Sequence, residues 1–149
     1  MVDRTMQGVY PILSMPFDSH ARIDVEDLQR EVEYLIKSGV DGIGLAMASE
    51  IYKLSENERN VAITAIVKQV NHRAKVVINT SAPGTDTSIL FSHTAQDLGA
   101  DAIMVMPPAG IHPSIITNYY KSISESISLP IFIQDTDSLP LEPDLLVQI

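Results

Sequence analysis

Short apolar runs alternate along the chain with longer segments in which apolar residues recur every three or four positions. The short runs contain almost no polar positions, and they are Val9–Met15, Gly42–Ala46, Lys75–Asn79, Ala102–Met106 and Pro130–Gln134. Strands that are covered on both faces have this composition, and the strands of a parallel sheet that is covered by helices are buried in this way. The pattern therefore predicts five parallel β-strands with helices between them.

The segments between the runs carry the start and stop signals of helices. Asp24 and Ser55 are both suited to cap a helix N-terminus, and Glu58 completes a capping box with Ser55. Gly39 and Gly99 stand where the first and third helices should end, since glycine readily adopts the left-handed conformation of that position. We therefore expect a helix after each of the two caps and another over residues 85–98.

A fourth helix is expected over residues 114–126, and Pro143 suits the first turn of a fifth. The apolar positions that the fourth helix should bury are Ile115, Ile116, Tyr119, Ile123 and Ile127. The fifth helix would have barely two turns before Ile149, where no stop signal is found. We interpret this as a helix that the chain does not complete.

Two α/β folds fit four βα units and the start of a fifth. A (β/α)8 barrel, or TIM barrel, typically needs about 250 residues, so residues 1–149 would form its first half and stop before the sixth strand. A flavodoxin-like open sheet needs only five units. The unfinished helix favours the half barrel, because an open sheet needs that helix to cover one of its faces. No linker divides the chain, and a single domain is expected. Ile131 and Ile133 of the last strand are expected to face the interior of the barrel.

The charge of the chain argues against nucleic acid as a partner. The formal net charge is −9, and such an acidic surface repels phosphate backbones. No apolar run approaches the roughly 20 residues that cross a bilayer, and the first seven residues lack the apolar core of a signal peptide. We therefore expect a cytoplasmic protein that does not enter a membrane.

The sequence offers little for a metal or a cofactor. Cysteine is absent, which removes thiolate ligands, cysteine nucleophiles and disulfides together. The histidines are far apart in the sequence and show no ligand spacing: His20, His72, His93 and His112. No glycine-rich phosphate loop is present either. We expect neither a metal site nor a cofactor.

An ordered series of local sequences carries a resemblance to a known family. The series consists of residues 8–18, 35–43, 49–50, 54–59, 98–102 and 129–131. At matching spacing over essentially the whole chain, it is similar to the dihydrodipicolinate synthase and N-acetylneuraminate lyase family. The resemblance implies a (β/α)8 barrel, usually a homo-oligomer such as a tetramer, with class I aldolase or lyase chemistry on pyruvate or a related 2-keto acid.

The resemblance also implies which groups perform that chemistry. A lysine on the sixth strand of such proteins forms a Schiff base with the keto carbon, and the protonated imine then accepts electrons during bond making or breaking. A tyrosine at the end of the fifth strand relays protons. A Gly-Thr-Thr-Gly-Glu loop after the second strand holds the substrate carboxylate. Here the sixth strand would lie beyond Ile149.

The chain departs from its relatives at several of these places. The loop after the second strand reads Ala46-Met47-Ala48-Ser49-Glu50, so only the glutamate is retained. The tyrosine and asparagine that end the fifth strand align with Gln134 and Asp135, and a tyrosine pair after the fourth strand aligns with Pro108-Ala109. The resemblance thus supports the fold more strongly than dihydrodipicolinate synthase activity, and the substrate pocket is expected to have diverged.

Candidate substrate-binding residues follow the strands, because barrel sites lie at the strands' C-terminal ends. Ala48, Ser49 and Glu50 belong to the loop after the second strand. Ser49 and the neighbouring backbone amides could hold a carboxylate. Glu50 could orient that loop or a substrate hydroxyl, or simply bond to nearby amides. We expect Ser49 to share one cleft with Gln134.

The other candidates follow the third and fifth strands. Asn79 could donate a hydrogen bond to a polar ligand, although asparagine is also an ordinary turn former. Gln134 cannot shuttle protons, but it can hydrogen-bond a substrate. Asp135 could act as a base if burial raised its pKa, or it could cap the turn that follows.

None of the lysines is placed like the family's Schiff-base lysine. Lys37, Lys68 and Lys121 fall on predicted helices, Lys75 begins a strand, and Lys53 lies in the loop after the second strand. We expect the chain to be an inactive fragment of a Schiff-base-forming lyase or aldolase whose catalytic lysine lies elsewhere. The alternatives are a dehydratase or a binder of another oxo acid and, less favoured, a non-enzymatic flavodoxin-like binding module.

Overall fold

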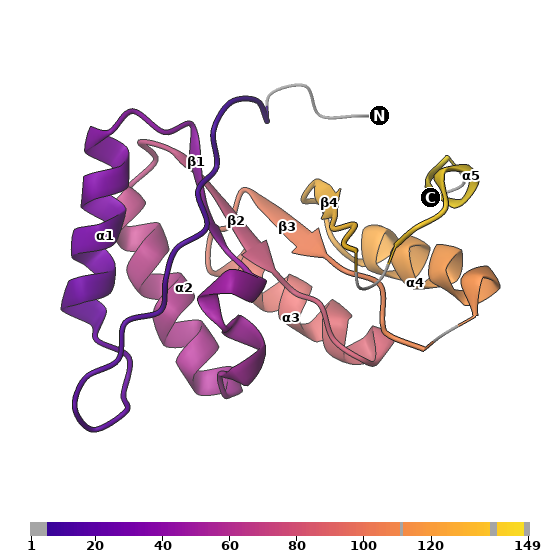
Figure 1. The fold of residues 1–149 in the computed structure, drawn as a ribbon, viewed down its shortest axis with the longest axis horizontal. Helices are drawn as coiled ribbons and strands as arrows, with labels where there is room; N and C mark the ends of the chain where they lie inside the picture. Colours follow the sequence, from indigo (N-terminus) through magenta and orange to yellow (C-terminus); the bar gives the residue numbers. More distant parts are fainter. Residues whose placement is uncertain (1–5, 111, 138–139, 148–149) are drawn as a thin grey trace.

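A four-stranded parallel sheet forms the centre of the computed structural model, which describes residues 6–110, 112–137 and 140–147 (Figure 1). The strands lie side by side in the order in which they occur in the sequence: β1 (Gly42–Leu45), β2 (Lys75–Asn79), β3 (Ala102–Val105) and β4 (Ile131–Ile133). The helices are α1 (Val25–Lys37), α2 (Glu56–Val70), α3 (Thr85–Asp97), α4 (Pro113–Ser126) and α5 (Pro143–Leu146). Two 3-10 turns, η1 (Met47–Ser49) and η2 (Ile51–Lys53), follow β1.

The segment over residues 9–13 runs parallel to β1 at the edge of the sheet, where a strand was predicted. Leu13 donates from its amide to the carbonyl of Gly44, and Gly44 donates to the carbonyl of Pro11, both at 2.9 Å. Only one bridge, between Ile12 and Gly44, satisfies the geometry of a strand pair. Pro11 has no N–H to donate, which weakens a regular ladder. The predicted strand thus exists as an edge segment with irregular pairing.

The predicted helix boundaries are largely confirmed. The side chain of Asp24 accepts from the Asp27 amide at 2.9 Å, and Ser55 with Glu58 forms the predicted capping box. The prediction that Ile115 is buried is wrong, because 52% of it is exposed. The predictions that Ile116, Tyr119 and Ile123 are buried are confirmed, and Tyr120, which was not predicted, is buried beside them. No helix in the described part of the chain is long and apolar enough to cross a membrane.

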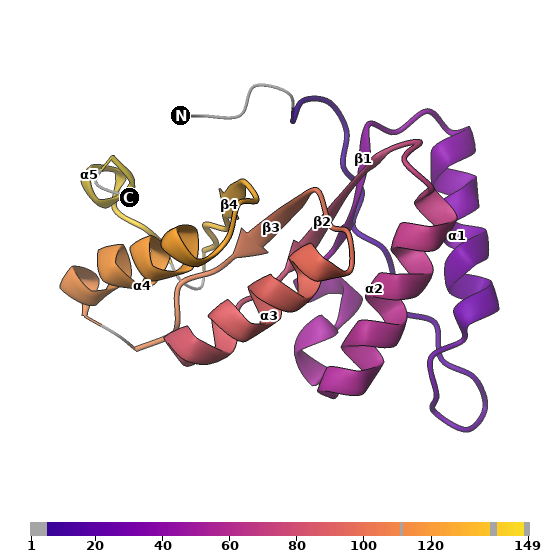
Figure 2. The same cartoon turned by 180° about the vertical axis from the view of Figure 1, so that it is seen from behind.

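Helices α1 to α4 all lie on one face of the sheet, as the two opposite views show (Figures 1 and 2). Alternate strand residues point into the core between sheet and helices, and they are Ile43, Leu45, Val76, Ile78, Ile103 and Val105. Helices on a single face are the arrangement of a (β/α)8 barrel, which carries its helices outside. The flavodoxin-like alternative, which needs helices on both faces, is therefore wrong.

The opposite face of the sheet, here called the concave face, carries the residues between those core positions. The strand register aligns Asn79, Met104 and Phe132 in one row across three strands. Ile131 and Ile133, which we expected inside the barrel, pack instead against the helix-side core. Successive residues of a strand point to opposite faces of the sheet. A shift of one residue in β4 therefore exchanges the residues that face the helices with those on the concave face.

Two aromatic rings from opposite edges of the sheet show how strongly it curves. Tyr10 lies in the edge segment and Phe132 in β4, yet their ring centroids are only 6.4 Å apart. In a flat sheet, four strand spacings would separate them by roughly 19 Å. The absence of a side chain at Gly42 makes room for Tyr10, whose ring would lie 2.0 Å from an added Cβ. The sheet thus has the curvature of half a barrel.

Candidate functional site

Two amide side chains meet on the concave face at the C-terminal end of the sheet. Asn79 ends β2 and is 1% exposed, and Gln134 directly follows β4 and is half-buried. The Nδ2 atom of Asn79 donates to the Oε1 atom of Gln134 at 3.1 Å. Strand β3 separates the two strands, but alternate strands of a TIM barrel contribute to the same interior layer. The curvature thus brings together two predicted site residues that are far apart in the sequence.

Further hydrogen bonds fix the orientation of the Asn79 amide. Its Oδ1 atom accepts from the backbone amide of Ser81 at 3.1 Å, which leaves Nδ2 facing Gln134. The hydroxyl of Ser81 in turn accepts from the amide of Met106 at 2.8 Å. Gln134 donates from its own backbone amide to Val105 at 2.8 Å. The ends of β2, β3 and β4 are therefore joined by a continuous set of hydrogen bonds.

Ser49 is fully buried, and its hydroxyl bonds to backbone groups. The hydroxyl donates to the carbonyl of Leu13 and accepts from the amide of Ala46 at 3.1 Å. These contacts tie the loop after β1 to the edge segment. In this structure, Ser49 shapes the loop, and its neighbours Ala48 and Glu50 are the exposed residues.

Glu50 lies in the same loop and pairs with a lysine. Its backbone is left-handed, with a φ angle of 57°, and its carboxylate lies 3.0 Å from the Nζ atom of Lys53. The hydrogen bond to Glu50 raises the pKa of Lys53, so this amine stays protonated at neutral pH. A protonated amine is not a nucleophile, which makes Lys53 a poor candidate for Schiff-base formation.

The other lysines lie away from the strands' C-terminal ends. Lys37, Lys68 and Lys121 are exposed on helices. Lys75 is the first residue of β2, at the opposite end of the sheet, and its Nζ atom lies 2.7 Å from Asp101. No lysine ends a strand in the described part of the chain.

Asp135 is exposed beside Gln134 and holds the loop that follows it. Its Oδ1 atom accepts from the amide of Leu141 at 2.9 Å. The contact reaches six residues along the chain and connects the end of β4 to the segment before α5. The structure therefore gives Asp135 an evident role in loop geometry.

Arg59 is a residue of this region that the sequence interpretation missed. It belongs to α2 but is only 5% exposed, and it donates to two backbone carbonyls, those of Ile51 at 3.2 Å and Asn79 at 2.9 Å. Its guanidinium lies 4.1 Å from the ring centroid of Phe91. Burial lowers its pKa to about 10, so it remains charged at neutral pH.

A signal for its burial was present in the sequence. Arg59 stands three, four and seven positions before Ala62, Ile63 and Ile66, which are all buried. This spacing places it on the apolar stripe of α2. A charged residue at a core position of a helix is therefore the pattern that could have identified it.

Buried hydroxyl groups of α3 and α4 bond to the loop after β2 and to the end of β3. Ser88 in α3 donates to the carbonyl of Thr80 at 2.9 Å, and Tyr119 in α4 donates to the carbonyl of Ala82 at 3.3 Å. Tyr120 donates to the carbonyl of Val105 at 3.0 Å, and burial raises the pKa of its phenol. Ser88 and Tyr119 thus hold the loop after β2, and Tyr120 holds the end of β3. The phenol of Tyr120 stays protonated, so it fixes geometry instead of exchanging a proton.

A sequence model of the dihydrodipicolinate synthetase family matches residues 5–143. The chain belongs to this family. The L-2-keto-3-deoxyarabonate dehydratase of Azospirillum brasilense is 31% identical to it over 135 residues, which are 87% of this chain and 44% of that protein. The 4-hydroxy-tetrahydrodipicolinate synthase of Methanocaldococcus jannaschii is 32% identical over 92% of this chain and 49% of its own length.

Solved structures of the dihydrodipicolinate synthetase family share the fold. A dihydrodipicolinate synthase crystal structure superposes with a TM-score of 0.90 at 30% identity, covering 95% of this chain and 51% of the other. The prophage protein YagE of E. coli K12, crystallised in complex with pyruvate, has a TM-score of 0.90 at 26% identity over 95% of this chain and 49% of its own. The chain spans about half the length of the relatives it matches, as the predicted half barrel requires.

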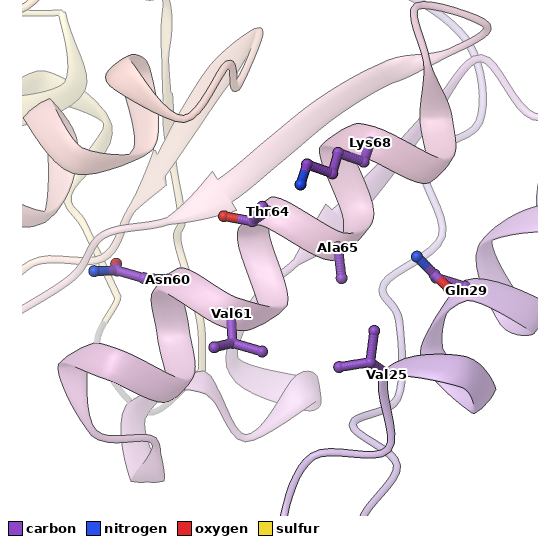
Figure 3. Close-up of a pocket in the computed structure, with 7 residues that line it drawn as sticks. All are labelled: Val25, Gln29, Asn60, Val61, Thr64, Ala65 and Lys68. Atoms are coloured by element: carbon purple, nitrogen blue, oxygen red, sulfur yellow. The ribbon is translucent and has the colours of Figure 1, made fainter.

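A groove of about 380 Å³ lies on the helix side of this half barrel, between α1 and α2 (Figure 3). It is lined by Val25, Gln29, Asn60, Val61, Thr64, Ala65 and Lys68. These residues belong to the outer layer, whereas Asn79 and Gln134 lie at the strand ends. The groove is therefore separate from the candidate site.

Proposed function

We propose that this chain forms the N-terminal half of a substrate site in a lyase of the aldolase type, which acts on pyruvate or a related 2-keto acid through a Schiff base. The observation that carries the proposal is the Asn79–Gln134 pair, at the barrel end where such sites lie. The Schiff-base lysine would stand on a sixth strand outside residues 1–149. We further propose that the complete protein is a cytoplasmic homo-oligomer.

The contacts suggest how the site residues divide their tasks. The Oε1 atom of Gln134 accepts from Asn79, so its Nε2 atom is the group that can donate to a substrate oxygen. Ser49 would hold the loop in which the exposed Ala48 and Glu50 face an incoming ligand. Asp135 would fix the backbone beside Gln134. Proton transfer would then require a group from the other half of the barrel.

A dehydratase acting on a 2-keto-3-deoxy sugar acid is the second candidate. It is favoured by the similarity to the enzyme named L-2-keto-3-deoxyarabonate dehydratase. It also fits Gln134, because a neutral amide hydrogen-bonds the hydroxyl groups of a sugar acid without titrating. Product analysis separates the two: water loss with an intact carbon chain indicates the dehydratase, and release of pyruvate with an aldehyde indicates the aldolase.

Trapping with borohydride tests the proposal. The protein is incubated with pyruvate and sodium borohydride, and the adducts are located by peptide mass spectrometry. For residues 1–149 we expect no selective adduct, because the lysines are paired or lie away from the strand ends. The complete parent should carry the adduct on one lysine beyond Ile149.

Two results would change this conclusion. A selective adduct on Lys53 would show that residues 1–149 contain their own nucleophile. A complete parent without any adduct would replace the aldolase with a relative that does not form a Schiff base. A reaction without pyruvate serves as the control for nonspecific modification.

A further inference from the structure

The guanidinium of Arg59 connects the loop after β1 to the end of β2. It donates to Ile51 in η2, just after Glu50, and to Asn79 at the end of β2. Phe91 of α3 lies against its face with 4.1 Å between the guanidinium carbon and the ring centroid. One side chain of α2 therefore contacts the loop after β1, the end of β2 and the next helix along the barrel.

The burial of this cation needs an explanation, because a buried charge is costly unless it is well bonded. None of the ion pairs in the described part of the chain includes Arg59. Its direct partners are the two neutral carbonyls and the aromatic ring, and the carboxylate of Glu56 in the same helix attracts it from beyond ion-pair distance. An apolar side chain could fill the same space without desolvating a charge, but it would leave both carbonyls without this donor.

The shape of arginine suits this position better than that of lysine. A guanidinium is planar, donates in several fixed directions at once and stacks on aromatic rings, whereas an ammonium is a single compact centre. A guanidinium therefore suits a position with two carbonyls from different segments and one aromatic ring. The bond to the Asn79 carbonyl also holds the main chain of the residue whose side chain contacts Gln134.

We propose that Arg59 is a positioning residue of the site: by fixing the main chain at Ile51 and Asn79, it sets the orientation of the Asn79–Gln134 amide pair. The importance of that orientation for a substrate rests on the proposed function. The bridging itself does not, because it is a property of residues 51, 59, 79 and 134 alone. Arg59 acts through Asn79 and contacts no substrate.

The test compares Arg59→Met and Arg59→Lys with Lys68→Met, which removes a cation from the exposed side of the same helix. Nitrogen-15 NMR spectra report the side-chain amides of Asn79 and Gln134 and the backbone amide of Ser81. We expect Arg59→Met to shift all three signals and Lys68→Met to leave them unchanged. Arg59→Lys should shift them partway, because an ammonium cannot both bond to the two carbonyls and stack on the ring.

A folded Arg59→Met or Arg59→Lys variant with lower stability but wild-type signals for these amides would overturn the proposal, because the arginine would then support the core without orienting the pair. If Arg59→Met does not fold, the charge-retaining Arg59→Lys decides the question.

In the complete protein, Arg59→Lys should weaken pyruvate binding by about tenfold, the effect of losing one hydrogen bond to a charged group. Wild-type protein that does not bind pyruvate would contradict the proposed function only, since the amide signals test Arg59 separately.

Discussion

The amide of Asn79 is buried and bonded on both of its polar atoms, which makes position 79 sensitive to substitution. A leucine of similar size would remove the acceptor of the Ser81 amide and the donor of Gln134 Oε1. Buried groups that lose their partners cost about 1–3 kcal/mol. We therefore expect Asn79→Leu to lower the free energy of unfolding by this amount in urea titrations, and Asn118→Leu, at an exposed site on α4, by less than about 0.5 kcal/mol.

A double-mutant cycle isolates the contact between the two amides. Asn79→Leu, Gln134→Ala and the double variant are compared by the same titrations. Residues in direct contact usually show interaction energies of about 0.5–3 kcal/mol, and distant residues add independently. Strict additivity would mean that Asn79 and Gln134 do not interact in solution.

At this scale, the sequence could predict where polar residues stand but not what they contact. The strand pattern and the barrel interpretation place Asn79 and Gln134 at the same end of the sheet. The contact between them depends on side-chain rotamers and on curvature, which periodicity does not encode. The hydroxyl of Ser49 likewise points to Leu13, because the turn η1 directs it there.

The packing of α1 against α2 contains a charged contact that should respond to pH. Glu33 in α1 accepts hydrogen bonds from Arg73, 2.8 Å away, and from Gln69, 2.9 Å away. These bonds hold the pKa of Glu33 at about 2, well below its ordinary value of 4.5. A carboxyl whose pKa is depressed on folding stabilises the fold above its unfolded-state pKa, and this stability is lost as the pH falls toward the folded-state value.

We therefore predict that Glu33→Gln flattens the loss of stability between pH 4.5 and pH 2. The measurement is urea unfolding at a series of pH values in that window, compared with wild type. Glu26→Gln is the matched control, since Glu26 lies in the same helix with its side chain 87% exposed. An identical slope in wild type and Glu33→Gln would show that the Arg73 contact does not persist in solution.

The positions of helices and strands were predicted more reliably than the faces on which their residues lie. The caps at Asp24 and Ser55 mark the helix starts because a side-chain oxygen there satisfies a free backbone amide, which is a local effect. The facing of Ile115 and of Ile131 depends on how each element is rotated against its neighbours. Ile115 is exposed while its neighbour Ile116 is buried, and Ile131 faces the helices instead of the barrel interior. Where several apolar residues follow one another, the sequence does not specify which of them faces the core.

Within the described residues, the sheet ends at the 9–13 segment on one side and at β4 on the other, and Val9 and Ile12 of the edge segment are exposed. Unpaired edges and uncovered apolar surface promote self-association. We predict that residues 1–149 form concentration-dependent oligomers, measured by size-exclusion chromatography with light scattering. Phe132→Lys on the concave face should shift the population toward monomer, and Ile115→Lys on the outer side of α4 should not. A monomeric wild-type chain at all concentrations would contradict this.

The global fold could be predicted because it rests on counting units and on the family resemblance, which the match over residues 5–143 confirms. Periodicity alone left the half barrel and the open sheet nearly equal. The distinction lies in which faces the helices cover and in the curvature measured between Tyr10 and Phe132. Both are relations between distant residues, which no local pattern specifies.

The identity of strand order and sequence order has a consequence for how the chain can fold. Each βα unit is laid down beside the one before it, so a new strand finds its partner among residues that have already left the ribosome. No strand has to wait for a later one to be inserted between it and its neighbour. Contacts between consecutive units close short loops, which favours rapid folding. The sheet can therefore grow in one direction during synthesis, from the edge segment toward β4.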